Sequence, residues 1–413
     1  MRGCALCGSV LVTMLSVQAI GREEEPAALR WSDVIRRIDG LPQAQEALNR
    51  VRGARAVADA VGQIPNPEAE FRLGRGTSAG GGPDVMEWGV ALTIPFDWIG
   101  PRGGERRAAR SEADAADWEA RAVRREVTGR LARLFWEIAH GQQLLKTLGE
   151  AEAQAARLAA VVRIRVEKGE SRPTELPRVE IELEQVRQER DRVLADLRAD
   201  RAAIEAILGL PEGSVQAVEE DGESLPEPPS REETIAKATR AHPRLEAALA
   251  RVRAREDLVA AERARRIPGF SLGGFFERER DGERAGGLLM VRIPAWNWNS
   301  GAIRRAEAER AAEERAAEAA ARELLAETLG AWERCSQARI AAERFREEIL
   351  PRAEAAARTV ERGYELGEFA LIDVLDARRM VLDARKSGIE ALLRVRVECT
   401  ALAVLTGGKE DAQ

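Results

Sequence analysis

The chain has 413 residues, of which 32% are charged and only 4% aromatic, and its formal net charge is −6. This net charge is small for the length and gives no indication of nucleic-acid binding. Abundant Ala, Arg, Glu and Leu with few aromatic residues are typical of long helices that pack along narrow seams and expose much of their circumference to water. The composition therefore disfavours a compact globular enzyme.

The first twenty residues differ in composition from the rest of the chain. Arg2 is followed by an apolar run that ends near Ala19, a small residue suited to cleavage. This pattern predicts a secretory signal peptide over residues 1–19, which is too short to span a bilayer as a helix. No later segment is apolar over about 18 residues, so the sequence predicts an exported chain without a transmembrane helix.

The chain contains two copies of one unit. Residues 169–209 align without a gap on residues 367–407, and both stretches begin with Gly-Glu inside a helical pattern. Between the copies, Pro, Glu and Ser residues cluster as they do in linkers. The predicted units are a first repeat at 20–210, a linker at 211–230, a second repeat at 231–408 and a tail at 409–413.

Each copy is expected to contain a helix, two strands and then a very long helical hairpin. Over 102–168 and 302–366, apolar residues recur at helical spacing. A helix of about 65 residues would be roughly 100 Å long, which no compact domain needs. Pro351 must kink the second of these helices near its end. The hairpin tips are predicted at about 166–176 and 364–374.

The segments between the helices alternate in polarity with period two, which indicates β-strands. They are predicted at about 64–75, 84–96, 267–279 and 285–294. One face of each strand is apolar, and a strand of about ten residues can cross a bilayer when tilted. The residues predicted to face lipid are Phe71, Met86, Trp88, Val90, Leu92, Phe270, Leu289 and Val291.

Four such strands cannot close into a barrel by themselves. Open strand edges in lipid would leave backbone groups unsatisfied, which is costly, so the chain is expected to assemble with copies of itself. Two chains would supply eight strands, whose interior side chains fill, whereas three would supply twelve and leave a pore. The alternative is a soluble protein with two small hairpins packed on its helices.

Two stretches resemble a known family. The run IPAWNWNSGAI at 293–303 resembles the strand-to-helix junction of TolC-type outer membrane efflux proteins, especially their heavy-metal efflux branch. The run YELGEFALIDVLDAR at 364–378 is similar to that family's periplasmic hairpin tip. Two features depart from the branch: the first tip contains Pro173 and Pro177, and we expect no lipid anchor.

The resemblance implies a mainly α-helical fold with a small β part. Three chains would form a twelve-stranded transmembrane barrel in the outer membrane that continues into a twelve-helix barrel in the periplasm. Such proteins are exit ducts, which pass substrates outward from an inner-membrane pump, here expected to be of the RND type, through a periplasmic adaptor protein. The predicted partners are therefore a homotrimer, the adaptor, the pump and outer-membrane lipid, with no cofactor and no enzymatic activity.

The resemblance also assigns residues at the two hairpin tips. Asp373 and Asp376 lie on one helical face, and acidic residues at these positions surround the closed periplasmic end in the family. The predicted gate comprises Tyr364, Glu365, Asp373 and Asp376 with Glu175 and Arg178 of the first copy. The predicted adaptor contacts are Gly169, Glu170, Gly367 and Glu368.

Two alternatives remain open for these charges. Asp373 and Asp376 could instead stabilise the positive end of a helix that begins near Leu371. Arg178 could partly neutralise the acidic ring, or it could pair with Asp376 of a neighbouring subunit.

Two cysteines lie at equal distance from the second tip. Cys335 lies 32 residues before Gly367 and Cys399 lies 32 residues after it. An oxidising periplasm would permit a disulfide, but a bridge needs a Cα separation of about 4.4 to 6.8 Å, below the usual packing distance of helices. The expectation is therefore two buried free thiols.

Other classes of protein fit less well. A periplasmic coiled-coil scaffold or tether without a pore would share the long helices but would not need matching strands in both copies. An adaptor has one helical hairpin rather than a duplicated one. The only histidines, His140 and His242, have no Cys or His near them in sequence, and no nucleophile, nucleotide or zinc motif occurs.

Overall fold

The computed structural model describes residues 28–61, 63–76, 85–96, 99–219, 227–240, 242–279, 281–293 and 295–407. The predicted signal peptide and the tail at 409–413 lie outside these residues. The first copy consists of β1 (Leu29–Arg30), α1 (Trp31–Ile38), α2 (Pro42–Val61), β2 (Glu68–Gly76), β3 (Val85–Pro95), α3 (Arg102–Glu167) and α4 (Glu175–Leu208). The second copy consists of β4 (Val218–Glu219), α5 (Arg231–Arg240), α6 (Pro243–Ala264), β5 (Gly269–Glu279), β6 (Gly282–Arg292), α7 (Ser300–Arg344), the π-helix η1 (Phe345–Ile349), α8 (Leu350–Glu365) and α9 (Leu371–Thr406).

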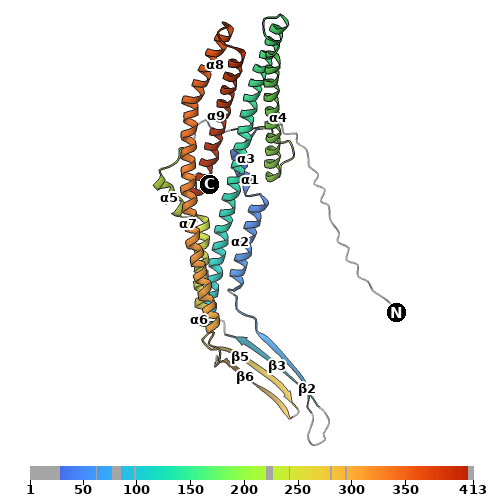
Figure 1. Ribbon diagram of the computed structural model, residues 1–413. Coiled ribbons are helices and arrows are strands. Elements are labelled where there is room, and N and C mark those ends of the chain that lie inside the picture. Colours follow the sequence, from blue (N-terminus) through green and yellow to red (C-terminus); the bar gives the residue numbers. More distant parts are fainter. Residues whose placement is uncertain are drawn as a thin grey trace, which may run out of the picture.

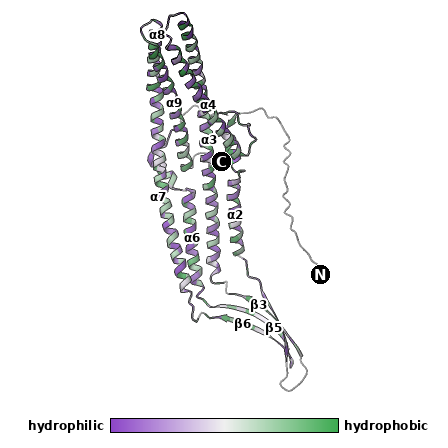
Figure 2. Ribbon diagram, turned by 45° about the vertical axis from the view of Figure 1, so that its right-hand side comes forward, coloured by the Kyte–Doolittle hydropathy of each residue, from purple (hydrophilic) through white to green (hydrophobic). Residues whose placement is uncertain are grey.

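The molecule is elongated, with helical hairpins at one end and a sheet at the other (Figure 1). The 66 residues of α3 run from the sheet to the first tip, so this helix is roughly 100 Å long. Polar and apolar residues are interspersed along the helices (Figure 2), as expected for helices that pack along narrow seams. No helix in the described part of the chain is long and apolar enough to cross a membrane.

The four long strands form one antiparallel sheet in the order β2-β3-β5-β6. The two hairpins of the sheet come from the two copies, and they meet where β3 pairs with β5, for example at Val90 and Phe276. Strands β2 and β6 are the outer edges. Neither edge has a strand beside it within the described residues of one chain, so the sheet is open on both sides.

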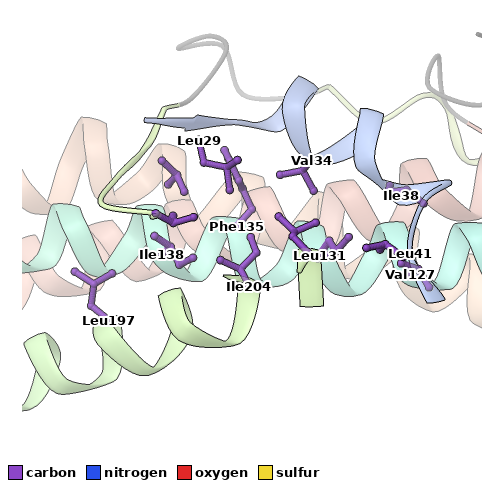
Figure 3. Close-up of a cluster of buried hydrophobic side chains, with 13 residues drawn as sticks. Leu29, Val34, Ile38, Leu41, Val127, Leu131, Phe135, Ile138, Leu197 and Ile204 are labelled. Carbon is purple, nitrogen blue, oxygen red and sulfur yellow. The ribbon is translucent and has the colours of Figure 1, made fainter. Parts of the chain in front are cut away.

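The largest core lies about halfway along the helices, where the first hairpin meets the N-terminal elements. Phe135 and Ile138 of α3 pack against Ile204 of α4 with no exposed surface (Figure 3). Side chains of β1, α1 and β4 cover this cluster from the other side. Burial in this core therefore explains why apolar residues recur at helical spacing in α3 and α4.

Part of the predicted linker is docked on this core. Strand β4 pairs in parallel with β1, and the side-chain amide of Gln142 bonds to both backbone groups of Val218. The Glu205 carboxylate is buried and accepts hydrogen bonds from the backbone N–H groups of Gly213 and Val215. These contacts fix the linker where it leaves the first copy.

The expected irregularity near Pro351 takes the form of a π-helical turn. Residues Phe345–Ile349 form η1, and Pro351 lies just inside α8. A proline cannot donate the helical hydrogen bond, and its ring crowds the preceding turn. The π-helical turn relieves both conflicts because it widens the helix at this point. Helix α3 of the first copy continues through the matching region without interruption.

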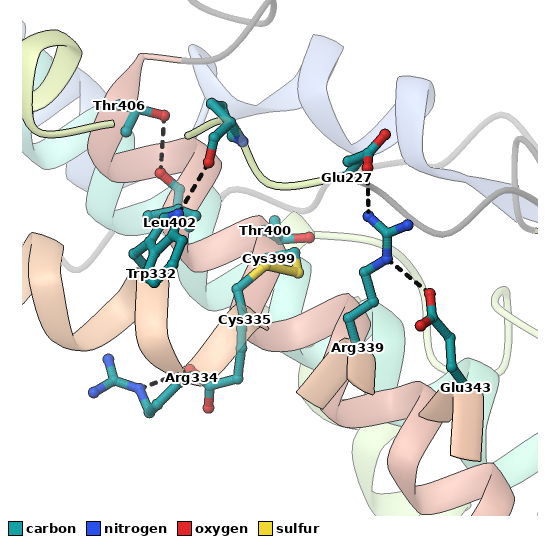
Figure 4. The surroundings of a disulfide bond; sticks show 12 residues. Glu227, Trp332, Arg334, Cys335, Arg339, Glu343, Cys399, Thr400, Leu402 and Thr406 are labelled. Atoms are coloured by element: carbon teal, nitrogen blue, oxygen red, sulfur yellow. Dashed lines mark hydrogen bonds and ion pairs between the residues drawn. A yellow bond between two sulfur atoms is a disulfide. The ribbon is translucent and has the colours of Figure 1, made fainter. Parts of the chain in front are cut away.

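The expectation of two free thiols was wrong. Cys335 of α7 and Cys399 of α9 form a disulfide with a Cα separation of 4.8 Å (Figure 4). The usual spacing of about 8 to 10 Å joins helix axes, and Cα atoms lie about 2.3 Å from each axis on the facing sides. Facing Cα atoms of helices at an ordinary axis spacing of about 9 Å therefore lie within the range that a disulfide needs.

Candidate functional site: the hairpin tips and the strand sheet

The two hairpin tips have the same turn geometry. Gly169 and Gly367 follow the long helices with φ of 75° and 81°, a conformation that glycine adopts without strain. The next residues, Glu170 and Glu368, donate their backbone N–H groups back to the last helical turn at 2.8 Å. All four residues, which were predicted to contact the adaptor, are exposed at the end of the molecule.

The two aspartates of the second tip have different local roles. The Asp373 carboxylate accepts a hydrogen bond from the backbone N–H of Ala370 at 2.8 Å, which satisfies a donor at the start of α9. Asp376 lies one turn later, and both carboxylates are exposed. Asp373 therefore stabilises the helix start, as the structural alternative predicts, while its other oxygen faces solvent.

Tyr364 joins the two hairpins. Its hydroxyl accepts a hydrogen bond from Nη1 of Arg165 in α3 at 3.1 Å, and the Arg165 guanidinium lies 5.5 Å from the centre of the ring. The ring packs beside a small apolar cluster formed by α3, α4 and α9. Sequence reasoning missed Arg165, because nothing in its own helix distinguishes it from the other exposed arginines.

The remaining predicted gate residues are not drawn together within one chain. Glu365 and Arg178 are exposed, and Glu175 is half-buried at the start of α4. Within the described part of one chain, neither Glu175 nor Arg178 forms an ion pair with Asp373 or Asp376. The expected pairing of Arg178 with Asp376 of a neighbour stays a prediction.

Below the tip, basic residues of α9 pair with acids on the surrounding helices. Arg378 contacts Glu361 of α8 at 2.8 Å, and Arg379 contacts Glu182 of α4 at 2.5 Å. Hydrogen bonding to Glu182 raises the pKa of Arg379 most, and the nearby Asp376 raises this pKa further. Two turns on, the same pattern recurs in the pairs Arg385–Glu354 and Lys386–Glu189.

These pairs were also missed by sequence reasoning, although a signal was present. The basic residues of α9 recur at a spacing of seven, and so do the acids on α8 and α4. A shared spacing of seven indicates that two helices face each other along a seam. The pairs Arg378–Glu361 and Arg385–Glu354 border a cavity of about 230 Å³ between the two hairpins, lined by residues of α3, α4, α8 and α9.

The sheet has one apolar and one polar face. Strand pairing places Phe71 opposite Val90 and Phe270 opposite Val291, and side chains alternate along each strand, so all eight residues predicted to face lipid share one face. Phe71 and Leu289 are 73% and 63% exposed there, which is unusual for large apolar side chains.

The opposite face carries charges. Arg72 of β2 pairs with Glu70 on the same strand at 2.9 Å and with Glu277 of β5 at 3.1 Å. The second pair reaches across β3 at Gly89, where an added Cβ would lie 2.9 Å from the Glu277 side chain. This face can therefore stand in water while the other stands in lipid.

No group of His, Cys, Asp and Glu side chains in the described residues is arranged to hold a metal ion. The sequence matches the profile of the family described as "Outer membrane efflux protein" over residues 40–210 and 234–408. The chain belongs to this family. It is therefore an outer-membrane efflux protein, as the resemblance implied. The family is one of transport ducts rather than of enzymes.

Individual relatives agree with this assignment. The cobalt-zinc-cadmium resistance protein CzcC of Cupriavidus metallidurans is 27% identical over 78% of this chain and 76% of its own length. The outer-membrane channel OprN has a TM-score of 0.79 at 17% identity, with 92% of this chain and 90% of that chain covered. The channel protein CusC has a TM-score of 0.78 at 18% identity, with 92% of both chains covered. The likenesses to the solved channels confirm the expected fold.

Proposed function

We propose that three copies of this chain form a continuous exit duct, which receives substrate from an inner-membrane pump through a periplasmic adaptor. The observation that carries this proposal is the open four-stranded sheet. Within the described residues, the sheet has one exposed apolar face, and the outer edges of β2 and β6 are unpaired. Such a sheet is stable in lipid only when its edges are paired with other strands. Because β2 and β6 run in opposite directions, the β6 edge of one chain can pair with the β2 edge of the next chain. A coiled-coil tether would need no such sheet.

The tips supply the gate in this proposal. The exposed Asp373 and Asp376 of three chains would place six carboxylates around the periplasmic opening, which would favour cations over anions. Glu365, Glu175 and Arg178 lie at the same end and would modulate this ring. The Tyr364–Arg165 contact holds the second hairpin against the first, so it would favour the closed opening.

The exposed Gly-Glu turns are the proposed adaptor contacts. Gly169, Glu170, Gly367 and Glu368 project beyond the helices and offer backbone groups and carboxylates to a partner. The pump is proposed to be of the RND type. The proposed substrates are divalent cations such as cobalt, zinc and cadmium, after the printed name of the relative CzcC.

Fractionation and cross-linking test the duct. We expect the protein to leave the outer membrane only with detergent, and amine cross-linking of the extract to give a product of three chains. A freely soluble single chain would contradict the proposal. Deletion of the gene should sensitise cells to zinc, cobalt or cadmium; sensitivity to dyes and antibiotics alone would retain the duct but overturn the metal substrates.

A further inference from the structure

The two helical hairpins are held together by different means at the same distance below their tips. In the first copy, Leu131, Phe135 and Ile138 of α3 pack against Leu197 and Ile204 of α4, and these side chains are 0% to 2% exposed. Large buried apolar side chains contribute on the order of 2 kcal/mol each, so this hairpin is secured by its core.

The second copy has mostly small side chains on the α7 side at this level. Ala331, Cys335, Ala338 and Ala342 follow one another along the face of α7 that packs against α9. On α9, Ala391 and Cys399 are joined by the larger Val395 and Leu402, which are 0% and 2% exposed. Alanine buries little apolar surface, so the α7 side contributes less to this seam than α3 contributes to the core of the first copy.

The disulfide lies in the centre of the alanine seam. Cys335 has no exposed surface and Cys399 is 6% exposed. Nearer the tip, α9 is held to the rest of its hairpin by partly exposed ion pairs such as Arg385–Glu354, each of which contributes little. The covalent bond is therefore the strongest connection between the arms of the second hairpin.

We propose that the Cys335–Cys399 disulfide is a redox-controlled anchor, which gives the second hairpin the attachment that the first obtains from its apolar core. On formation, the two thiols lose two protons and become joined, and two electrons pass to the disulfide of a thiol–disulfide oxidoreductase, which becomes a dithiol. The periplasm is an oxidising compartment that supports this exchange. The chain acquires its anchored second hairpin only after export.

Hydrogen exchange on the purified protein tests the anchor. We expect reduction by a phosphine to accelerate amide exchange in peptides covering residues 391–402 by up to about 1,000-fold, the effect of removing a link that closes a loop of this size. The matched peptide of the first hairpin, residues 193–204, should not change. Mass spectrometry of unreduced peptides should find residues 335 and 399 linked.

A variant without the sulfur atoms provides the control. Cys335→Ala with Cys399→Ala should exchange as fast as the reduced wild type and should not respond to the reductant. Equal exchange in the oxidised and reduced wild type would overturn the proposal, as would equal acceleration in both hairpins. Fast exchange in the double variant alone would assign the effect to a cavity and would also overturn it. None of these readouts requires a pore, so the anchor and the proposed duct are tested separately.

Discussion

At the scale of single residues, the contact between Tyr364 and Arg165 gives the most specific prediction, because one hydroxyl group links the two hairpins. Tyr364→Phe keeps the ring in its apolar cluster and removes only the acceptor of the 3.1 Å hydrogen bond. We expect the free energy of association between the two hairpins to become less favourable by about 1 kcal/mol. In planar bilayers, the variant should open spontaneously more often than the wild type.

A double-variant comparison isolates this bond. Arg165→Leu alone should have a similar effect, and adding it to Tyr364→Phe should change the opening frequency little further, because the bond is already lost. Fully additive effects would show that the two residues act independently and would refute the contact.

The two tip aspartates can be separated by their effects on stability. Asp373→Ala removes the acceptor of the Ala370 N–H and should lower the stability of the second tip by about 1 kcal/mol, seen as a lower Tm. Asp376→Ala removes no cap of this kind and should leave Tm unchanged. Both variants should reduce the preference of the channel for cations, measured as a reversal potential in a salt gradient. A lower Tm for Asp376→Ala would contradict the division of roles.

At the scale of elements, two adjacent glycines in β5 provide a matched pair. An added Cβ at Gly273 would lie 2.5 Å from the carbonyl oxygen of Leu92 in β3, whereas one at Gly274 would lie 3.7 Å from that of Gly286. Gly273→Ala should therefore push β5 from β3 and cost a few kcal/mol, while Gly274→Ala is tolerated. The amounts of assembled protein in the outer membrane should differ accordingly. Equal amounts would refute the strand register.

The first hairpin should respond to pH through a half-buried carboxyl pair. Burial raises the pKa of the Glu137 carboxyl, and the nearby Asp200 raises it further. The folded state therefore favours protonated Glu137, and this contribution to stability is lost as pH rises through the raised pKa. Glu137→Gln should increase Tm at about pH 7 and leave it unchanged near pH 4, below the usual carboxyl range. An increase at both values would indicate a packing effect instead.

The sequence predicts elements well where their periodicity is long and uninterrupted. The expected helix at 102–168 corresponds to α3, and the expected first tip at 166–176 contains the turn that begins after Glu167. Alternation also identified the strands, because each has one apolar face along its whole length. These patterns are local, so they are visible without knowledge of the packing.

The remaining features depend on distances between segments that are far apart in sequence. Arg165 and Tyr364 are separated by 199 residues, and the disulfide by 64. The disulfide was missed because the spacing of helix axes was compared with a Cα separation, although facing Cα atoms lie closer together than the axes do. The linker composition likewise gave no sign that the Gln142 side chain attaches Val218 to α3.

At the scale of the whole molecule, the duplication explains why the second copy differs from the first. Each copy supplies two strands of the sheet and one helical hairpin, so the complete molecule requires both copies. Only the second copy combines a π-helical interruption, an alanine seam and a disulfide. The two hairpins are therefore alike in outline and differ in how their two arms are joined.

The open edges of the sheet also have a genetic consequence. A chain whose β2 or β6 edge is damaged would still join neighbours through its intact edge, and each ring that contains it would be broken. When normal chains and chains with one damaged edge strand are made in equal amounts, only about one eighth of trimers would be wholly normal, since three independent choices are combined. Export should then fall well below one half, measured as metal tolerance in cells that carry both genes. Because each edge strand needs a neighbouring chain, a chain with one damaged edge can inactivate the intact chains with which it assembles.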